Sequence, residues 1–73
     1  MPTFSDRLKS LRRENNILQK DLAMLLKVTP RAIRNYENGS HEPCYDSLIK
    51  LADYFNVSLD YLLGRTDNPK TNK

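Results

Sequence analysis

The chain has 73 residues, enough for one small domain, and a hydrophobic fraction of 38% that can supply a small helical core. Its single cysteine, Cys44, excludes an internal disulfide framework and is typical of a reducing cytoplasm, where we expect the protein to act. No apolar run reaches the roughly 18 residues of a membrane-spanning helix. The N-terminal stretch also lacks the apolar segment of a secretion signal, so we expect no membrane partner.

Charge is distributed unevenly along the chain, whose net charge is +3. Residues 1–36 carry eight Lys and Arg against three Asp and Glu, whereas residues 37–64 carry one against five. Such a division indicates that the protein has an oriented electrostatic field, with the basic half of the chain facing a polyanion. Chance segregation of charges in a short chain is the alternative explanation.

The first predicted helix spans Phe4–Asn15. Thr3 precedes it as an N-cap, and Asp6 stands three residues later, where it completes a capping box. Leu8 and Leu11 continue an apolar stripe that begins at the first helical residue, at spacings of four and three. The asparagines at its end tolerate the left-handed conformation of a C-cap.

The sequence pattern of residues 19–39 predicts two short helices joined by a tight turn. The first begins at Gln19, and its apolar residues recur at helical spacing. The second spans Pro30–Asn38, because Thr29 offers a side-chain oxygen as N-cap and proline is tolerated at the first helical position. Gly39 follows the last residue, where glycine commonly terminates a helix.

The second of these helices has two chemically different faces. At about 100° per residue, Ile33, Tyr36 and Glu37 share one side. The opposite side carries the guanidinium and carboxamide groups of Arg31, Arg34, Asn35 and Asn38. In the DNA major groove, arginine bonds guanine and asparagine bonds adenine in a bidentate manner. The pattern favours a DNA-reading face, and a solvated polar face is the alternative.

Two further helices complete the predicted all-α chain. One spans about Tyr45–Phe55 with its leucines inward. Ser58 caps a short final helix over Leu59–Leu63, and Gly64 terminates it. Residues 65–73 are polar, and we expect this tail to be disordered or a linker.

The ordered set of these features resembles the helix-turn-helix of the phage repressor/Cro family, also called the Xre-type regulators. The residues that match the motif are Gln19, Leu22, Ala23, Leu26, Val28, Ile33 and Tyr36-Glu37-Asn38-Gly39. The stretches that match outside the motif are Arg7-Leu8-Lys9, Leu11-Arg12, Glu42-Pro43 and residues 51–64. The resemblance implies a compact five-helix bundle of the lambda-repressor type, formed by one domain over residues 1–64. The second and third helices would form the helix-turn-helix.

The resemblance implies sequence-specific binding of double-stranded DNA by a transcriptional regulator, which we expect to be a bacterial or phage-encoded repressor. In this family the domain binds as a homodimer to a pseudo-palindromic operator whose half-sites lie about 34 Å apart. The expected contacts to bases are those of Pro30, Arg31, Arg34 and Asn35. The expected contacts to phosphates are those of Gln19, Thr29, Asn38, Ser40 and His41.

In this family an arginine and a glutamate pair and tie the first helix to the recognition helix. The resemblance carries these roles to Arg12 and Glu37. An inward-facing glutamate on a DNA-binding helix needs such a partner, because an unpaired buried charge is strongly destabilising. Two independent surface charges are the alternative.

Two positions depart from the family pattern. Leu18 stands where Ser, Thr or Asn usually caps the second helix, and the missing acceptor costs roughly 1 kcal/mol. Lys27 stands in the turn where glycine is preferred, and a left-handed backbone there costs a lysine about 1 kcal/mol. We expect the lysine to alter the local turn without abolishing the motif.

Apolar residues near the end of the last helix exceed what so short a helix needs. We expect Leu59, Leu62 and Leu63 to contribute to a weak self-association that DNA tightens. A place in the core is the alternative for Leu62.

Two other functional classes stand beside DNA binding. An antitoxin or protein-interaction module on the same fold is the main alternative, but it would not need four DNA-suited side chains on one face. An enzyme is rejected, because the chain has one histidine, one cysteine and no glycine-rich phosphate loop. His41 and Cys44 could form half of a metal site, but a structural zinc needs four ligands. We therefore expect no catalytic residues, no metal and no cofactor.

Overall fold

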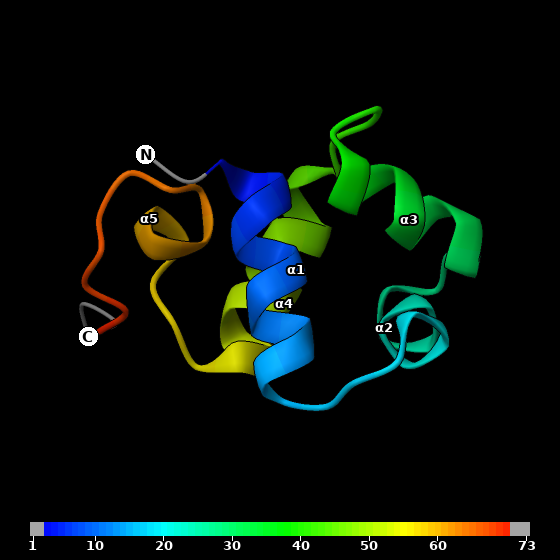
Figure 1. The fold of residues 1–73 in the computed structure, drawn as a ribbon, viewed down its shortest axis with the longest axis horizontal. Helices are drawn as coiled ribbons and strands as arrows, with labels where there is room; N and C mark the ends of the chain where they lie inside the picture. Colours follow the sequence, from blue (N-terminus) through cyan, green and yellow to red (C-terminus); the bar gives the residue numbers. More distant parts are fainter. Residues whose placement is uncertain (1–2, 71–73) are drawn as a thin grey trace.

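The computed structural model describes residues 3–70, which form five α-helices (Figure 1). The helices are α1 (Phe4–Glu14), α2 (Gln19–Leu26), α3 (Pro30–Asn38), α4 (Tyr45–Phe55) and α5 (Leu59–Leu62). No strand occurs in this part of the chain. The expected all-α, five-helix fold is confirmed, although the first and last helices each end one residue earlier than expected.

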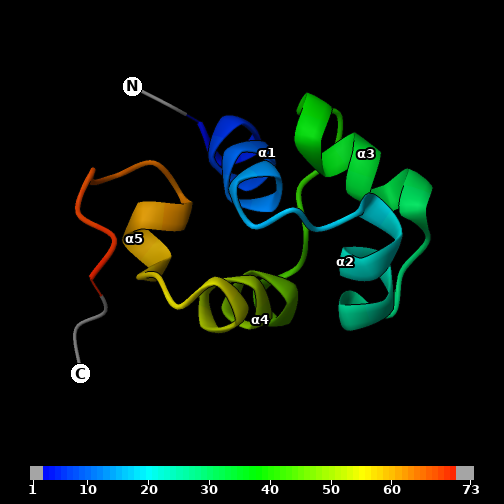
Figure 2. The ribbon, with the colours of Figure 1, turned by 60° about the horizontal axis from the view of Figure 1, so that its bottom comes forward.

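The long helix α1 lies at the centre of the arrangement. It contacts α3 on one side and α5 on the other, while α2 packs against α3 and α4 contacts α5. Figures 1 and 2 show α2 and α3 together at one end of the molecule and α5 at the opposite end. The helix α3, the expected recognition helix, therefore lies at an outer edge of the fold.

Each helix contributes one side chain that is completely shielded from solvent. In chain order these side chains are Leu8, Leu22, Ile33, Leu51 and Leu62. Burying one leucine or isoleucine contributes roughly 1.5–3 kcal/mol, so the five together hold all the helices to one core. This burial corrects the expectation that Leu62 contacts a second copy, because its side chain fills the core and cannot reach a partner.

The capping box of α1 is present as the sequence predicted. Thr3 Oγ1 accepts a hydrogen bond from Asp6 N at 3.3 Å, and the Asp6 carboxylate accepts one from Thr3 N at 3.3 Å. After the helix ends at Glu14, Asn16 adopts a left-handed backbone with a φ of 55°. Asparagine tolerates this conformation better than most residues, which explains how the chain turns toward α2.

The turn between α2 and α3 keeps the left-handed geometry that glycine adopts, so the expected alteration of the turn by Lys27 is not seen. Lys27 is the C-cap of α2, with the left-handed φ of 57° and ψ of 44° that a glycine adopts without strain. Thr29 Oγ1 accepts a hydrogen bond from Ala32 N at 3.2 Å, and Pro30 begins α3. Leu18 makes no side-chain capping bond at the start of α2, as expected.

Residues 65–70 of the expected tail contact the last helix. Ser58 N donates a hydrogen bond to Pro69 O at 3.0 Å. Figures 1 and 2 show this segment passing along the side of α5 that faces away from α1. Residues 71–73 lie outside the described residues, and the expected division of the chain after Gly64 stays a prediction.

Arg7, which received no role of its own from the sequence, is a buried charge on α1 with 7% of its surface exposed. Its guanidinium carbon lies 3.9 Å from the centre of the Tyr61 ring, and its Nη2 pairs with Asp67 Oδ1 at 3.3 Å. Burial disfavours the charged form, but Tyr61 and Asp67 outweigh burial and raise the pKa of Arg7 above its ordinary value. Arg7 therefore stays charged and links α1 to α5 and to the segment that follows it.

Candidate nucleic-acid interface

The outer face of α3 is polar and accessible to solvent, as the sequence predicted. Its outward side chains are those of Arg31, Arg34, Asn35 and Asn38, of which Asn35 is half-buried. Thr29 and Pro30, at the start of the helix, are exposed as well. On the opposite face, Ile33 is completely buried and Glu37 retains 6% of its surface. The helix is therefore held through one face and offers the other.

The structure contains the expected ion pair between α1 and α3. Arg12 Nε and Nη2 donate to the two carboxylate oxygens of Glu37, the second over 3.1 Å. Arg12 Nη1 donates a third hydrogen bond, to Ile17 O at 3.0 Å in the loop before α2. Only 14% of the Arg12 side chain and 5% of the Glu37 side chain are exposed. This bidentate contact, sheltered from water, fixes the position of α3 against α1.

Gln19, the first residue of α2, joins this pair. Its Nε2 donates a hydrogen bond to Glu37 Oε1 at 3.3 Å. The Glu37 carboxylate thus accepts bonds from α1 and from α2, and connects both helices to α3. The side-chain amide of Gln19 carries two N–H donors. Within residues 3–70, one of them forms a side-chain hydrogen bond, the one to Glu37. A phosphate contact from Gln19 stays a prediction.

The loop after α3 presents side chains rather than backbone donors. Gly39 ends the helix with a left-handed φ of 83°. Ser40 N and His41 N then donate back to Asn35 O, at 3.0 and 3.4 Å. Asn38 Oδ1 accepts a second bond from Ser40 N at 2.9 Å, which leaves the amide nitrogen of Asn38 as a donor. The side chains of Asn38, Ser40 and His41 are exposed, and their contact with a phosphate stays a prediction.

Two basic residues near α3 received no role from the sequence. Lys9 and Arg13 are four residues apart on α1 and therefore share one side of that helix. Both line the same hollow as Arg34 of α3. The spacing of these two residues was the signal in the sequence that could have revealed them, because positive side chains four residues apart on a helix form one patch.

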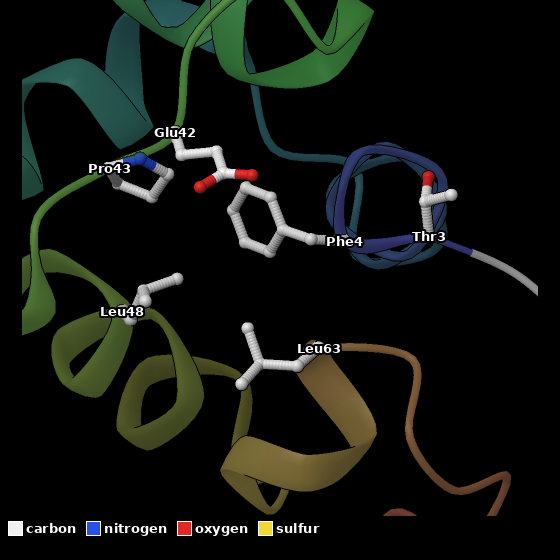
Figure 3. Close-up of a pocket in the computed structure, with 6 residues that line it drawn as sticks. All are labelled: Thr3, Phe4, Glu42, Pro43, Leu48 and Leu63. Carbon is white, nitrogen blue, oxygen red and sulfur yellow. The ribbon is translucent and has the colours of Figure 1, made fainter.

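The remaining dimer candidates, Leu59 and Leu63, are half-buried. Leu63 lines a cavity of about 420 Å³ together with Phe4 and Leu48, and Thr3 and Glu42 add polar groups to its lining. Figure 3 shows the side chains of Leu63, Phe4 and Leu48 converging on the cavity from the end of α5, from α1 and from α4. A contact between these residues and a second copy stays a prediction.

No helix in the described part of the chain has the length and apolar character needed to cross a membrane. Within residues 3–70, no group of three or more His, Cys, Asp or Glu side chains is placed to hold a metal ion. Cys44 is an exposed free thiol, and its hydrogen bond with Ser47 Oγ at 3.4 Å lowers the pKa of the thiol.

The sequence is similar to known regulators over most of its length. The helix-turn-helix family model matches residues 8–62. The chain is 42% identical over 67 residues to the uncharacterized HTH-type transcriptional regulator YqaE of Bacillus subtilis (strain 168), over 92% of this chain and 58% of that protein. It is 39% identical over 71 residues to the HTH-type transcriptional regulator ImmR of the same organism, over 97% of this chain and 56% of that protein. The chain thus spans less than two thirds of the length of either relative.

The fold is also similar to that of a solved repressor. The crystal structure of the P22 c2 repressor protein in complex with a synthetic operator superposes with a TM-score of 0.79 and 28% sequence identity. The match covers 86% of this chain and 96% of that one. The likeness therefore extends over most of both chains.

Proposed function

Because the chain belongs to the helix-turn-helix family, we propose that it is a transcriptional regulator that binds double-stranded DNA at specific sites and represses transcription. The operator bound by the P22 c2 repressor supports this class of partner. We further propose that the protein acts in the bacterial cytoplasm and has no catalytic activity. The proposal concerns the domain described here, since the Bacillus relatives are longer proteins.

The observation that carries this proposal is the anchored polar face of α3. Arg12 and Gln19 both bond to Glu37, so the helix is held from α1 and from α2. A recognition helix reads bases only where its framework sets it in the groove, and phosphate contacts then fix its register. An anchored helix with outward arginine and asparagine side chains supports this mode of binding.

The proposal gives the outward side chains two kinds of task. Arg31 and Asn35 read bases, while Pro30 and Arg34 touch the groove wall or a base. The residues that position the phosphate backbone are Gln19, Thr29, Asn38, Ser40 and His41.

Binding to random-sequence duplex DNA at low and moderate salt tests the proposal. We expect an electrophoretic shift that weakens as salt rises, with a nonspecific Kd of about 10⁻⁴–10⁻⁶ M near physiological salt. Replacing Arg31 and Arg34 together with alanine should weaken the shift. Lys50→Ala, an exposed lysine on α4, should not. A wild-type protein that shifts no duplex even at low salt would contradict DNA binding and favour the protein-interaction alternative.

We propose that two copies bind one pseudo-palindromic operator and associate weakly through the region of α5. Leu59→Glu should then shift a monomer–dimer equilibrium toward the monomer, because association would bury an unpaired carboxylate. Sedimentation at high protein concentration, with and without a duplex selected from a random pool, measures this shift. The matched control is Met24→Glu on α2, whose side chain is 77% exposed.

Because Leu59 is half-buried, its replacement could also disturb the fold. Circular dichroism of the Leu59→Glu protein checks that it is folded. The selected duplex should contain two inverted half-sites about one helical turn apart. A wild-type protein that stays monomeric both free and on that duplex would rule out the dimer.

A further inference from the structure

A hollow of about 200 Å³ opens beside the recognition helix, where α1, the start of α2 and the end of α3 meet. The cationic side chains that line it are those of Lys9, Arg12 and Arg13 from α1 and Arg34 from α3. Glu37 is the one acidic residue that lines the hollow within the described part of the chain. The hollow therefore gathers four positive charges around one negative charge.

Three of these positive charges have no ion-pair partner among residues 3–70. The Glu37 carboxylate is bonded by Arg12, so these two charges compensate each other. Within residues 3–70, no carboxylate lies within ion-pair distance of Lys9, Arg13 or Arg34. Like charges held around one space repel each other, and an anion placed among them relieves this repulsion.

The other flank of α3 has the opposite character. A second hollow, of about 260 Å³, lies there and is lined by Asn35, Tyr36, His41 and Glu42 among others. With histidine counted as neutral, Glu42 gives this flank a single negative charge. A helix in the major groove has one sugar-phosphate strand along each flank. With histidine counted as neutral, this second hollow therefore lacks the positive charge that lines the first.

We infer that the cationic hollow holds a backbone phosphate of one DNA strand through Lys9, Arg13 and Arg34. This inference rests on the proposed DNA binding and refines it. Arg34 is then a phosphate-positioning residue and not a reader of bases, although it stands on the outer face of the recognition helix. Arg31, one turn nearer the start of the helix, is not among the residues that line either hollow.

The experiment compares Arg34→Gln, Lys9→Gln and Arg13→Gln with Lys50→Gln, whose lysine lies on α4 outside the hollow. Binding is measured to an operator selected by the wild type and to a scrambled duplex over a salt series. Each of the three variants should weaken both duplexes by a similar factor. Each should also reduce the slope of log K against log salt by about 1, because a lost phosphate contact releases fewer counterions. Lys50→Gln should change neither quantity.

Two outcomes would overturn the inference while DNA binding stands. In the first, Arg34→Gln lowers the operator-to-scrambled ratio by about fivefold or more, as loss of a base contact would. In the second, all three variants keep the wild-type salt slope, which means that the hollow holds no phosphate. A wild type that binds no duplex overturns the proposed function as well, and is recognised before any variant is made. Melting of Lys9→Gln, whose lysine is half-buried, separates lost contacts from lost folding.

Discussion

Replacing Arg12 with alanine is expected to lower the free energy of unfolding by about 3–5 kcal/mol. The Glu37 side chain is only 5% exposed, and the change leaves it with the Gln19 amide at 3.3 Å as its remaining side-chain donor. One neutral donor does not compensate a buried negative charge. The carbonyl of Ile17 loses its bond to Arg12 at the same time. The loss therefore acts on α1, α3 and the loop between α1 and α2 together.

Chemical denaturation followed by circular dichroism measures this loss. Arg13→Ala is the matched control, because Arg13 is the next residue, is exposed and forms no ion pair within residues 3–70. A surface change of this kind is expected to stay within about 0.5 kcal/mol. In a domain of this size, each kcal/mol lost lowers the melting temperature by about 4–8 °C, so the two variants should be well separated. Equally small effects would mean that Arg12 behaves as an ordinary surface residue.

The helix boundaries could be predicted because the interactions that set them are local. Thr3 and Asp6 are three residues apart, as are Thr29 and Ala32, and both pairs form the expected capping bonds. Capping signals that span only three or four residues can be read from the local sequence, whatever the rest of the chain contains.

Contacts between distant residues could be predicted only where the family resemblance supplied them. Arg12 and Glu37 are 25 residues apart and were expected to pair on that ground alone. No pattern of spacing reports the bond between Gln19 and Glu37, or the pair that Arg7 forms with Asp67 across 60 residues. Such contacts depend on how the whole bundle closes, which hydrophobic periodicity does not specify.

The burial of Leu62 shows a second limit of the sequence pattern. The helix α5 has four residues, little more than one turn, so it offers no repeat from which a buried side can be read. Leu59 and Leu63 flank Leu62 with similar hydrophobicity, yet only Leu62 is completely buried. The direction of α5 relative to α1 decides which leucine enters the core, and that direction is a property of the assembled fold.

Arg31→Ala and Asn35→Ala are expected to weaken binding to the operator far more than binding to a scrambled duplex. The two residues are four apart and stack one turn from each other on the outer face of α3. Residues near the start of a recognition helix reach base edges, where arginine bonds guanine and asparagine bonds adenine. Each bidentate contact gives about 1–3 kcal/mol of discrimination, so the operator-to-scrambled ratio should fall by about 5- to 150-fold.

Gln19→Ala is the matched contrast, because Gln19 is expected to meet only the phosphate backbone. A phosphate contact carries no direct sequence information, so the variant should weaken the operator and the scrambled duplex by similar factors. The salt slope should barely change, since a neutral amide neutralises no phosphate. The bond from Gln19 to Glu37 makes a melting curve of this variant necessary, so that a loosened α3 is not mistaken for a lost contact.

Binding of the wild type and the three variants to both duplexes over a salt series measures the ratio and the slope together. A reader of bases changes the ratio and keeps the slope, whereas a charged phosphate contact changes the slope and keeps the ratio. Selection of new duplexes by Arg31→Ala should also relax the choice at one base pair, because the missing guanidinium no longer distinguishes guanine there. If Arg31→Ala and Asn35→Ala both leave the ratio unchanged, the base contacts have been assigned to the wrong residues of the recognition face.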